Sequence, residues 1–69
     1  MRKWSEELII LSRELLNIDG VNVKSINGNF GILNIDYKNK VYSISIFDSD
    51  VVLTFDSVEE MINAGWAVD

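Results

Sequence analysis

Asp48 and Asp50, separated by one serine, are the residues whose types and spacing come closest to a chemical site. An Asp-x-Asp pair of this kind is a common way to hold a divalent cation. A calcium loop would need further oxygen ligands at set spacings and a closing Glu, and these are lacking. Asp and Ser are also favoured turn residues, and apolar runs stand on both sides of this segment. We therefore interpret it as a turn between two strands and expect neither a metal nor a cofactor.

Catalysis by other side chains is limited, because the 69-residue chain contains no His and no Cys. The commonest general base and the thiol nucleophile are missing, which leaves carboxylates, Lys, Tyr, Ser and Thr. Paired carboxylates can hydrolyse glycosides, but a small single-sheet domain has little room for the water-excluding cleft that this needs. Gly28 and Gly31 do not form a phosphate loop, since neither a Lys-Ser/Thr pair nor a helix follows them. We expect a protein that is not an enzyme.

The length of the chain limits the architecture around these residues. We expect a single α+β domain over residues 1–69, because so short a chain cannot build two cores. Apolar residues at spacings of three and four predict a first helix, with Ser5 near its start and Asp19-Gly20 as its stop. The stripe consists of Trp4, Leu8, Leu11, Leu15 and Ile18, and Ile9, Ile10 and Leu16 widen it.

Beyond this helix the apolar residues recur at every second position, which is typical of strands. The four runs are Val21–Ile26, Phe30–Tyr37, Val41–Phe47 and Val51–Phe55. A second helix follows: Asp56 or Ser57 caps its start, Gly65 ends it, and Trp66 packs back onto Met61 as part of the core. The predicted fold is a small α-β-β-β-β-α domain, a four-stranded antiparallel meander with the helices packed mainly on one face.

The alternation also predicts which side chains share a face, because a slip of one residue would turn a whole strand over. It requires even loops at Lys38-Asn39 or Asn39-Lys40 and at Asp48-Ser49, and an odd loop at Asn27-Gly28-Asn29. One face is then apolar and must be covered by helices. The other face is largely polar but carries five apolar side chains that should cluster, with Phe30 opposite both Ile26 and Phe47. This predicted patch consists of Ile26, Phe30, Ile32, Phe47 and Val52.

An exposed apolar patch usually marks an interaction site. The alternative is that the second helix or the C-terminal Ala67-Val68 segment folds over the patch and buries it. The sequence leaves both interpretations open. If the patch is exposed, a second copy of the chain is one candidate to cover it.

The charges are distributed unevenly along the chain, whose net charge is −5. All six basic residues lie within residues 1–40 together with five acids, whereas residues 41–69 hold six acids and no Lys or Arg. Such a field attracts basic surfaces and repels phosphate backbones, although solubility alone is the simpler explanation. We expect a protein partner with a basic surface and no direct nucleic-acid binding. The acids predicted to meet that partner are Asp48, Asp50, Asp56, Glu59 and Glu60.

These features favour a small acidic protein-binding module, for example a phage or mobile-element inhibitor that occupies a basic, nucleic-acid-handling surface of an enzyme. Two other classes stay open: a self-associating structural or regulatory protein, and an inter-subunit small-molecule or nucleotide-binding protein that stacks a base on Tyr37, Tyr42 and Trp66. A bias toward Ile and Asn, with no Pro, is typical of an AT-rich bacterial or phage source. With no long apolar run and no evident signal peptide, we expect no membrane association and a cytoplasmic location in the bacterial host.

Overall fold

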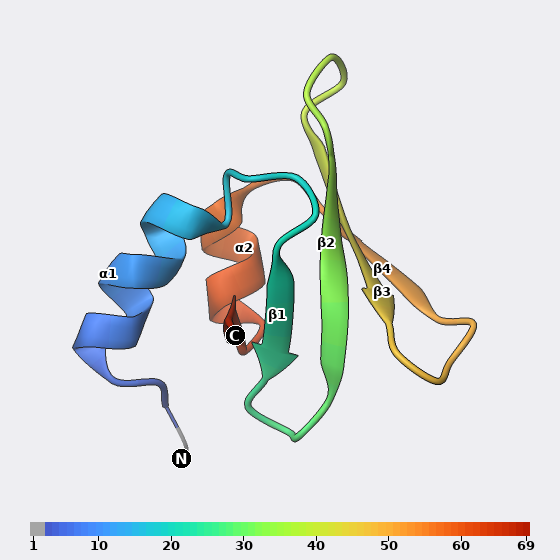
Figure 1. Ribbon diagram of the computed structural model, residues 1–69. Helices are drawn as coiled ribbons and strands as arrows, with labels where there is room; N and C mark the ends of the chain where they lie inside the picture. The colour runs from blue at the N-terminus through green and yellow to red at the C-terminus, as the bar shows by residue number, and fades with distance from the viewer. Residues whose placement is uncertain (1–2) are drawn as a thin grey trace.

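The computed structural model describes residues 3–69, which form a five-stranded antiparallel sheet and two helices (Figure 1). The elements in chain order are α1 (Glu6–Leu15), β1 (Asn22–Ser25), β2 (Phe30–Asp36), β3 (Val41–Ile46), β4 (Val52–Phe55), α2 (Val58–Asn63) and β5 (Trp66–Val68). The predicted α+β class is confirmed. The predicted count of four strands is wrong, because the C-terminal segment forms a fifth.

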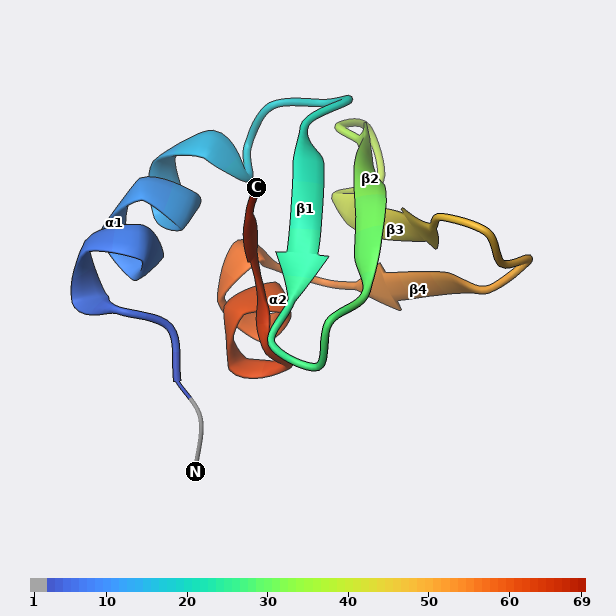
Figure 2. The same cartoon turned by 60° about the horizontal axis from the view of Figure 1, so that its bottom comes forward.

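The strand order in the sheet is β4-β3-β2-β1-β5. The first four strands form the predicted meander, and α2 then carries the chain from β4 at one edge to β5 at the other. In β5, Val68 lies opposite Val23 and Ala67 lies opposite Lys24. Figure 2 shows α1 beside β5 at this end of the sheet. The two edges of the sheet therefore differ. The edge at β5 lies next to α1, and the other edge is formed by β4.

The predicted apolar stripe of α1 is confirmed in part, because Leu8, Leu15 and Leu16 pack against the core. Ser5 caps the helix as expected, since its Oγ accepts a hydrogen bond from the Leu8 N–H at 3.2 Å. The fully buried residues on this side of the helix are Ser12 and Leu16, whereas Leu11 of the predicted stripe is exposed. The reason is that Ser12 faces β5, where its Oγ accepts a hydrogen bond from the backbone of β5. A polar residue thus occupies the centre of the buried face, and Ile10, Leu11 and Ile18 remain exposed.

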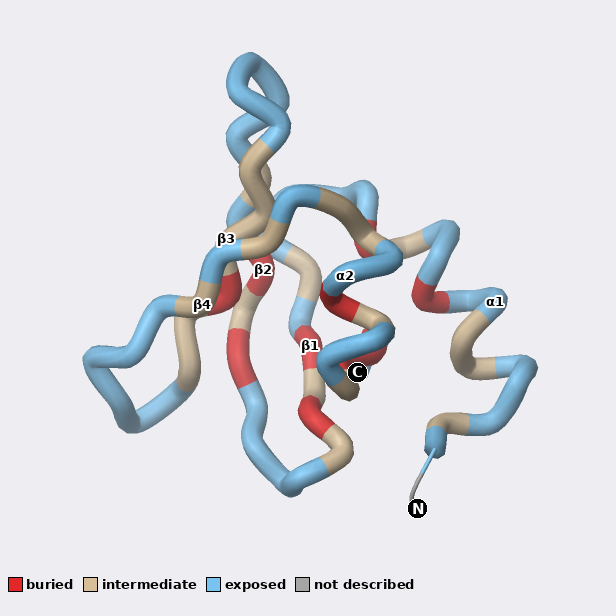
Figure 3. The backbone as a smooth tube through the Cα atoms, turned by 180° about the vertical axis from the view of Figure 1, so that it is seen from behind, coloured by how far each residue is buried: buried red, intermediate tan, exposed pale blue. Residues whose placement is uncertain are grey.

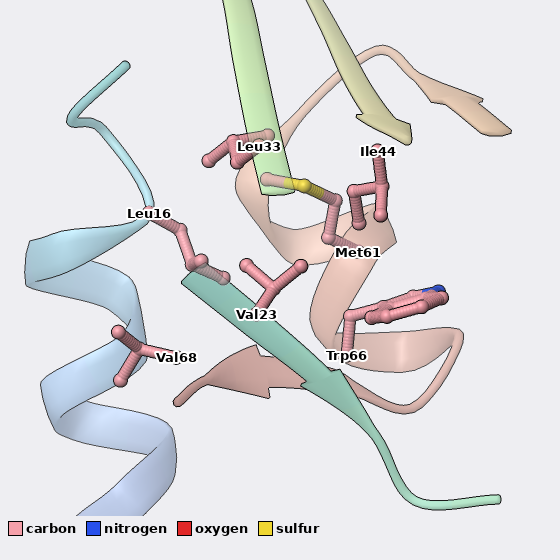
Figure 4. Close-up of a cluster of buried hydrophobic side chains, with 7 residues drawn as sticks. All are labelled: Leu16, Val23, Leu33, Ile44, Met61, Trp66 and Val68. Atoms are coloured by element: carbon pink, nitrogen blue, oxygen red, sulfur yellow. The ribbon is translucent and has the colours of Figure 1, made fainter. Parts of the chain in front are cut away.

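The core lies between the sheet and the helices (Figure 4). Met61 points from α2 toward Leu33 and Ile44 of the sheet, and all three side chains are fully buried. Trp66 is only 3% exposed, which confirms its predicted place in the core. Gly65 has the positive φ of 95° expected where a helix ends. The complete cluster consists of Leu16, Val23, Leu33, Ile44, Met61, Trp66 and Val68.

The predicted sharing of faces is confirmed across three hairpins, but one register differs. Leu33 lies opposite Ile44, which lies opposite Leu53, as the even loops require. Between β1 and β2, however, Lys24 rather than Ile26 lies opposite Phe30. The shift is two residues, so it leaves every side chain on its predicted face. The Ser25 N–H donates to the Asn29 carbonyl at 2.7 Å, so the three-residue loop is 26–28 and not the predicted 27–29. The Ile26 N–H donates instead to the carbonyl of Gly65, the residue before β5, at 2.8 Å.

The sheet coils strongly, and β3 and β4 run steeply across the direction of β1 and β2 (Figure 2). Gly31 permits the close approach of β2 to β3, since a Cβ there would lie 2.6 Å from the Ser45 carbonyl oxygen. The left-handed residues of the two later turns are Lys40, with φ 56°, and Asp48, with φ 60°.

Candidate functional site

Three large apolar side chains lie exposed on the sheet face that points away from the core. Phe30, Phe47 and Val52 are 49%, 52% and 56% exposed. Phe47 directly follows β3 and is a direct neighbour of Phe30 in β2, since the Phe47 N–H donates to the Phe30 carbonyl at 2.9 Å. Ile32 is half-buried and lies in the next row, opposite Ser45, which in turn lies opposite Val52. We call Phe30, Ile32, Phe47 and Val52 the open-face patch.

The second helix and the C-terminal Ala67-Val68 segment, the two candidates to cover this patch, lie elsewhere. Met61 of α2 packs into the core on the other side of the sheet, and Ala67 and Val68 belong to β5. Within residues 3–69, neither segment covers Phe30 or Phe47. Figure 3 shows exposed residues along the β3–β4 loop and the adjoining part of β4.

Ile26, the fifth residue of the predicted patch, is not part of it. It is half-buried and lines a hollow of about 390 Å³ between the N-terminal segment and the end of α2. Trp4 and Ile62 line the same hollow, and the Trp4 indole N–H donates to the Gly65 carbonyl at 2.9 Å. The pairing of Ile26 with Gly65 places it there.

Asp48 and Asp50 lie in the turn between β3 and β4, directly beside the open-face patch. Both are exposed, and Ser49 between them accepts a hydrogen bond from the Val51 N–H at 3.1 Å. Asp48, which precedes Ser49, has a left-handed backbone conformation. The described residues 3–69 contain no cluster of three or more carboxylates placed to hold a metal ion. The segment therefore has the geometry of a turn with two carboxylates on the rim of an apolar surface.

The other three acids of the predicted site lie at the opposite end of β4, where α2 begins. Glu59 forms an ion pair with Arg13 of α1, with Nε–O distances of 3.1 and 3.2 Å. Glu60 accepts a hydrogen bond from the Asp56 N–H at 2.6 Å, and its own N–H donates to Ser57. The structure thus separates the five acids into two groups. Glu59 and Glu60 have structural partners of their own.

The three aromatic residues considered for stacking a base do not come together. Trp66 lies opposite Ser25, whereas Tyr42 lies opposite Ile35, near the other end of the sheet. The Tyr37 hydroxyl donates to the Asn17 carbonyl at 2.9 Å. Trp66 is buried, so its ring is not accessible to a base.

The outer edge of β4 is a feature that the residue pattern did not single out. In the ladder with β3, the Ile46 N–H donates to the Val51 carbonyl, so residues 51, 53 and 55 direct their backbone groups to β3. The alternation turns the N–H and C=O groups of Val52 and Thr54 outward. The sequence does contain a signal for this open edge, because Val51–Phe55 has no charged residue and no Pro to protect it from pairing with another strand.

The comparisons with known proteins give no match: no family model fits the chain, and no curated protein and no solved structure is significantly similar to it. Within residues 3–69, neither helix is long and apolar enough to cross a membrane.

Proposed function

We propose that the protein is a small protein-binding module that docks a partner on its open-face patch. The observation that supports this most is the side-by-side exposure of Phe30 and Phe47 on a sheet face that no segment of residues 3–69 covers. Large aromatic side chains are enriched at the centres of protein interfaces and rare as exposed neighbours. Such a surface suits the docking of a partner rather than catalysis.

The apolar area is large enough to contribute useful binding energy. A phenylalanine side chain exposes roughly 200 Å² in the unfolded chain, so a half-exposed ring leaves on the order of 100 Å² to be covered. At about 25 cal/mol per Å², each ring contributes roughly 2.5 kcal/mol before the cost of association. Phe30 and Phe47 together would form the centre of the interface, and Val52 would extend it.

The charges beside the patch indicate the chemistry of the partner. Asp48 and Asp50 border Phe47 and Val51 in the chain and are exposed. The ion pairs within residues 3–69 join Arg13 to Glu59 and Lys24 to Asp69, and neither uses these two carboxylates. We therefore expect a partner with an apolar centre and Lys or Arg at its rim. The narrower expectation, an inhibitor of a nucleic-acid-handling enzyme, is consistent with this chemistry and remains a prediction.

A capture experiment with matched variants tests the proposal. The wild-type chain, Phe30→Asp/Phe47→Asp and the control Ile10→Asp/Ile18→Asp are immobilised, and captured proteins are quantified in lysate of the source cells. Both double variants add two carboxylates at exposed apolar positions, on the sheet and near α1 respectively. We expect one protein to be captured by the wild type and the α1 control and lost with the sheet variant. Equal capture by all three folded proteins would refute the open-face patch as the docking site.

A further inference from the structure

The outer edge of β4 lies next to the open-face patch and offers a second kind of contact. Val52 belongs to both features, since its side chain is in the patch and its backbone groups point outward from the sheet. Together with Thr54 it presents two N–H donors and two C=O acceptors at the edge. No strand within residues 3–69 pairs with this side of β4. Such an edge is a template for a further strand.

The opposite edge of the sheet is closed, which makes β4 distinctive. There, the Val68 N–H donates to the Ser12 Oγ at 3.0 Å, and α1 lies along β5. Natural edge strands are otherwise protected by charges, Pro or a bulge, and Val51–Phe55 has no charge and no Pro. Among the described residues, α1 thus covers the edge at β5, and no segment pairs with the uncharged edge at β4.

The acids at the two ends of β4 decide which strand suits this edge. Asp50 precedes the strand and Asp56 follows it, and both are exposed. If a second copy paired with β4 antiparallel, with Val52 opposite Thr54 of the second copy, then Asp50 would lie opposite Asp56 of the second copy at each end. Two like-charged pairs, added to a net charge of −5 on each copy, disfavour that arrangement. A strand with basic ends would meet complementary charge at the same positions.

We propose that β4 receives an extended segment of the partner as a sixth strand, with an apolar centre and Lys or Arg at both ends. This inference rests on the proposed function and specifies its mode. The segment would hydrogen-bond the outward groups of Val52 and Thr54, and its basic ends would lie near Asp50 and Asp56. Side chains on one side of it would extend the open-face patch beyond Val52.

The test uses a probe peptide of nine residues, with alternating Val and Thr in the centre and two Lys at each end. Its binding to the ¹⁵N-labelled full chain is followed by NMR. We expect the Val52 and Thr54 amides to shift and to gain protection from hydrogen exchange. The same peptide with Glu in place of Lys should bind at least about tenfold more weakly. Equal binding of the two peptides would overturn the charge argument.

A matched pair of variants tests the backbone contact directly. Thr54→Pro removes an outward N–H and is compatible with an edge strand, whereas Thr54→Val changes the side chain and keeps the N–H. We expect the first variant, once its NMR spectrum shows that it is folded, to weaken peptide binding by about tenfold or more and the second to retain it. If Thr54→Pro does not fold, the exchange protection of Val52 and Thr54 in the wild type decides.

Three results would overturn the inference. Peptide binding that shifts Phe30 and Phe47 without protecting Val52 and Thr54 would mean docking on the face, so the proposed function would stand without strand addition. Concentration-dependent protection of these amides in the free protein would identify a second copy as the occupant. Failure of the peptide to bind at about 1 mM would exclude β4 as a receiving edge, whereas the proposed function would still be judged by the capture experiment.

Discussion

The backbone N–H of Val68 donates to the buried Oγ of Ser12 at 3.0 Å, and this bond joins α1 to the outer edge of β5. Without the Ser12 hydroxyl, the Val68 N–H would face an apolar helix surface, where neither a protein group nor water could accept its hydrogen bond. One serine on the buried face of α1 therefore satisfies the edge of the sheet that the helix covers. The edge at β4 has no equivalent within residues 3–69.

The first prediction follows from this contact. Ser12→Ala should lower the free energy of unfolding by about 1–3 kcal/mol, because it leaves the Val68 N–H buried without an acceptor. Ser43→Ala, at a half-buried position on the open face of β3, should change it by no more than about 0.5 kcal/mol. Urea unfolding of both variants measures the difference. A loss at Ser12 no larger than at Ser43 would mean that water reaches the β5 edge.

The second prediction separates backbone strain from packing at two glycines with nearly equal φ. Gly65 and Gly28 have φ values of 95° and 94°. A Cβ at Gly65 would lie 2.9 Å from Ile26 Cγ2, whereas one at Gly28 would have no neighbour within 4 Å. Gly28→Ala should therefore cost roughly 1 kcal/mol, and Gly65→Ala about 1 kcal/mol more. Denaturant unfolding compares them, and equal losses would show that Ile26 does not pack against Gly65.

These two sites show which parts of the fold the sequence could predict. Helix ends and strand faces follow from local patterns, so the helix end at Gly65 and the position of Phe30 opposite Phe47 were predicted correctly. β5 was not, because it has three residues and its partner strand lies more than forty residues earlier, so nothing in the local pattern of Trp66–Val68 indicates it. The two-residue register shift at Phe30 also escapes the alternation, since it changes no face.

The residues of the candidate site were also predicted only in part, because alternation fixes the face of a side chain but not its long-range neighbours. Alternation correctly placed Phe30, Phe47 and Val52 on the face away from the helices. It could not exclude Ile26, whose position depends on β5. The sequence also grouped five acids by their order in the chain, whereas the length of β4 separates Asp48 and Asp50 from Glu59 in space.

The third prediction concerns pH. Hydrogen bonds from the Asn39 side chain, and then from backbone N–H groups of Asn39 and Lys38, hold the pKa of Asp36 below its ordinary value. A lowered pKa in the folded state means that this turn stabilises the fold above the unfolded-state pKa and loses that contribution as pH falls through the folded-state pKa. Asn39→Ala should raise the pKa of Asp36 toward its ordinary value. An NMR titration of the carboxyl checks this, and an unchanged pKa would assign the shift to another cause.

The fourth prediction tests the acidic rim against the overall charge. Asp48→Asn/Asp50→Asn removes two charges beside the open-face patch, and Glu7→Gln/Glu14→Gln removes two from exposed positions on α1. With the captured partner, the first variant should slow association severalfold and reduce its dependence on salt, and the second should have a smaller effect. Association rates measured at two ionic strengths provide the comparison. Equal effects would mean that only the net charge matters.

Site-specific photocrosslinking tests the central claim most directly, since it reports which surface touches the partner. A photoreactive phenylalanine analogue replaces Phe47 in one protein and Ile10 of α1 in a control, both at positions about half exposed. After capture and irradiation, we expect a covalent adduct with the partner from position 47 and none from position 10. An adduct from position 10 alone, with position 47 unreactive in the bound complex, would contradict docking on the open-face patch.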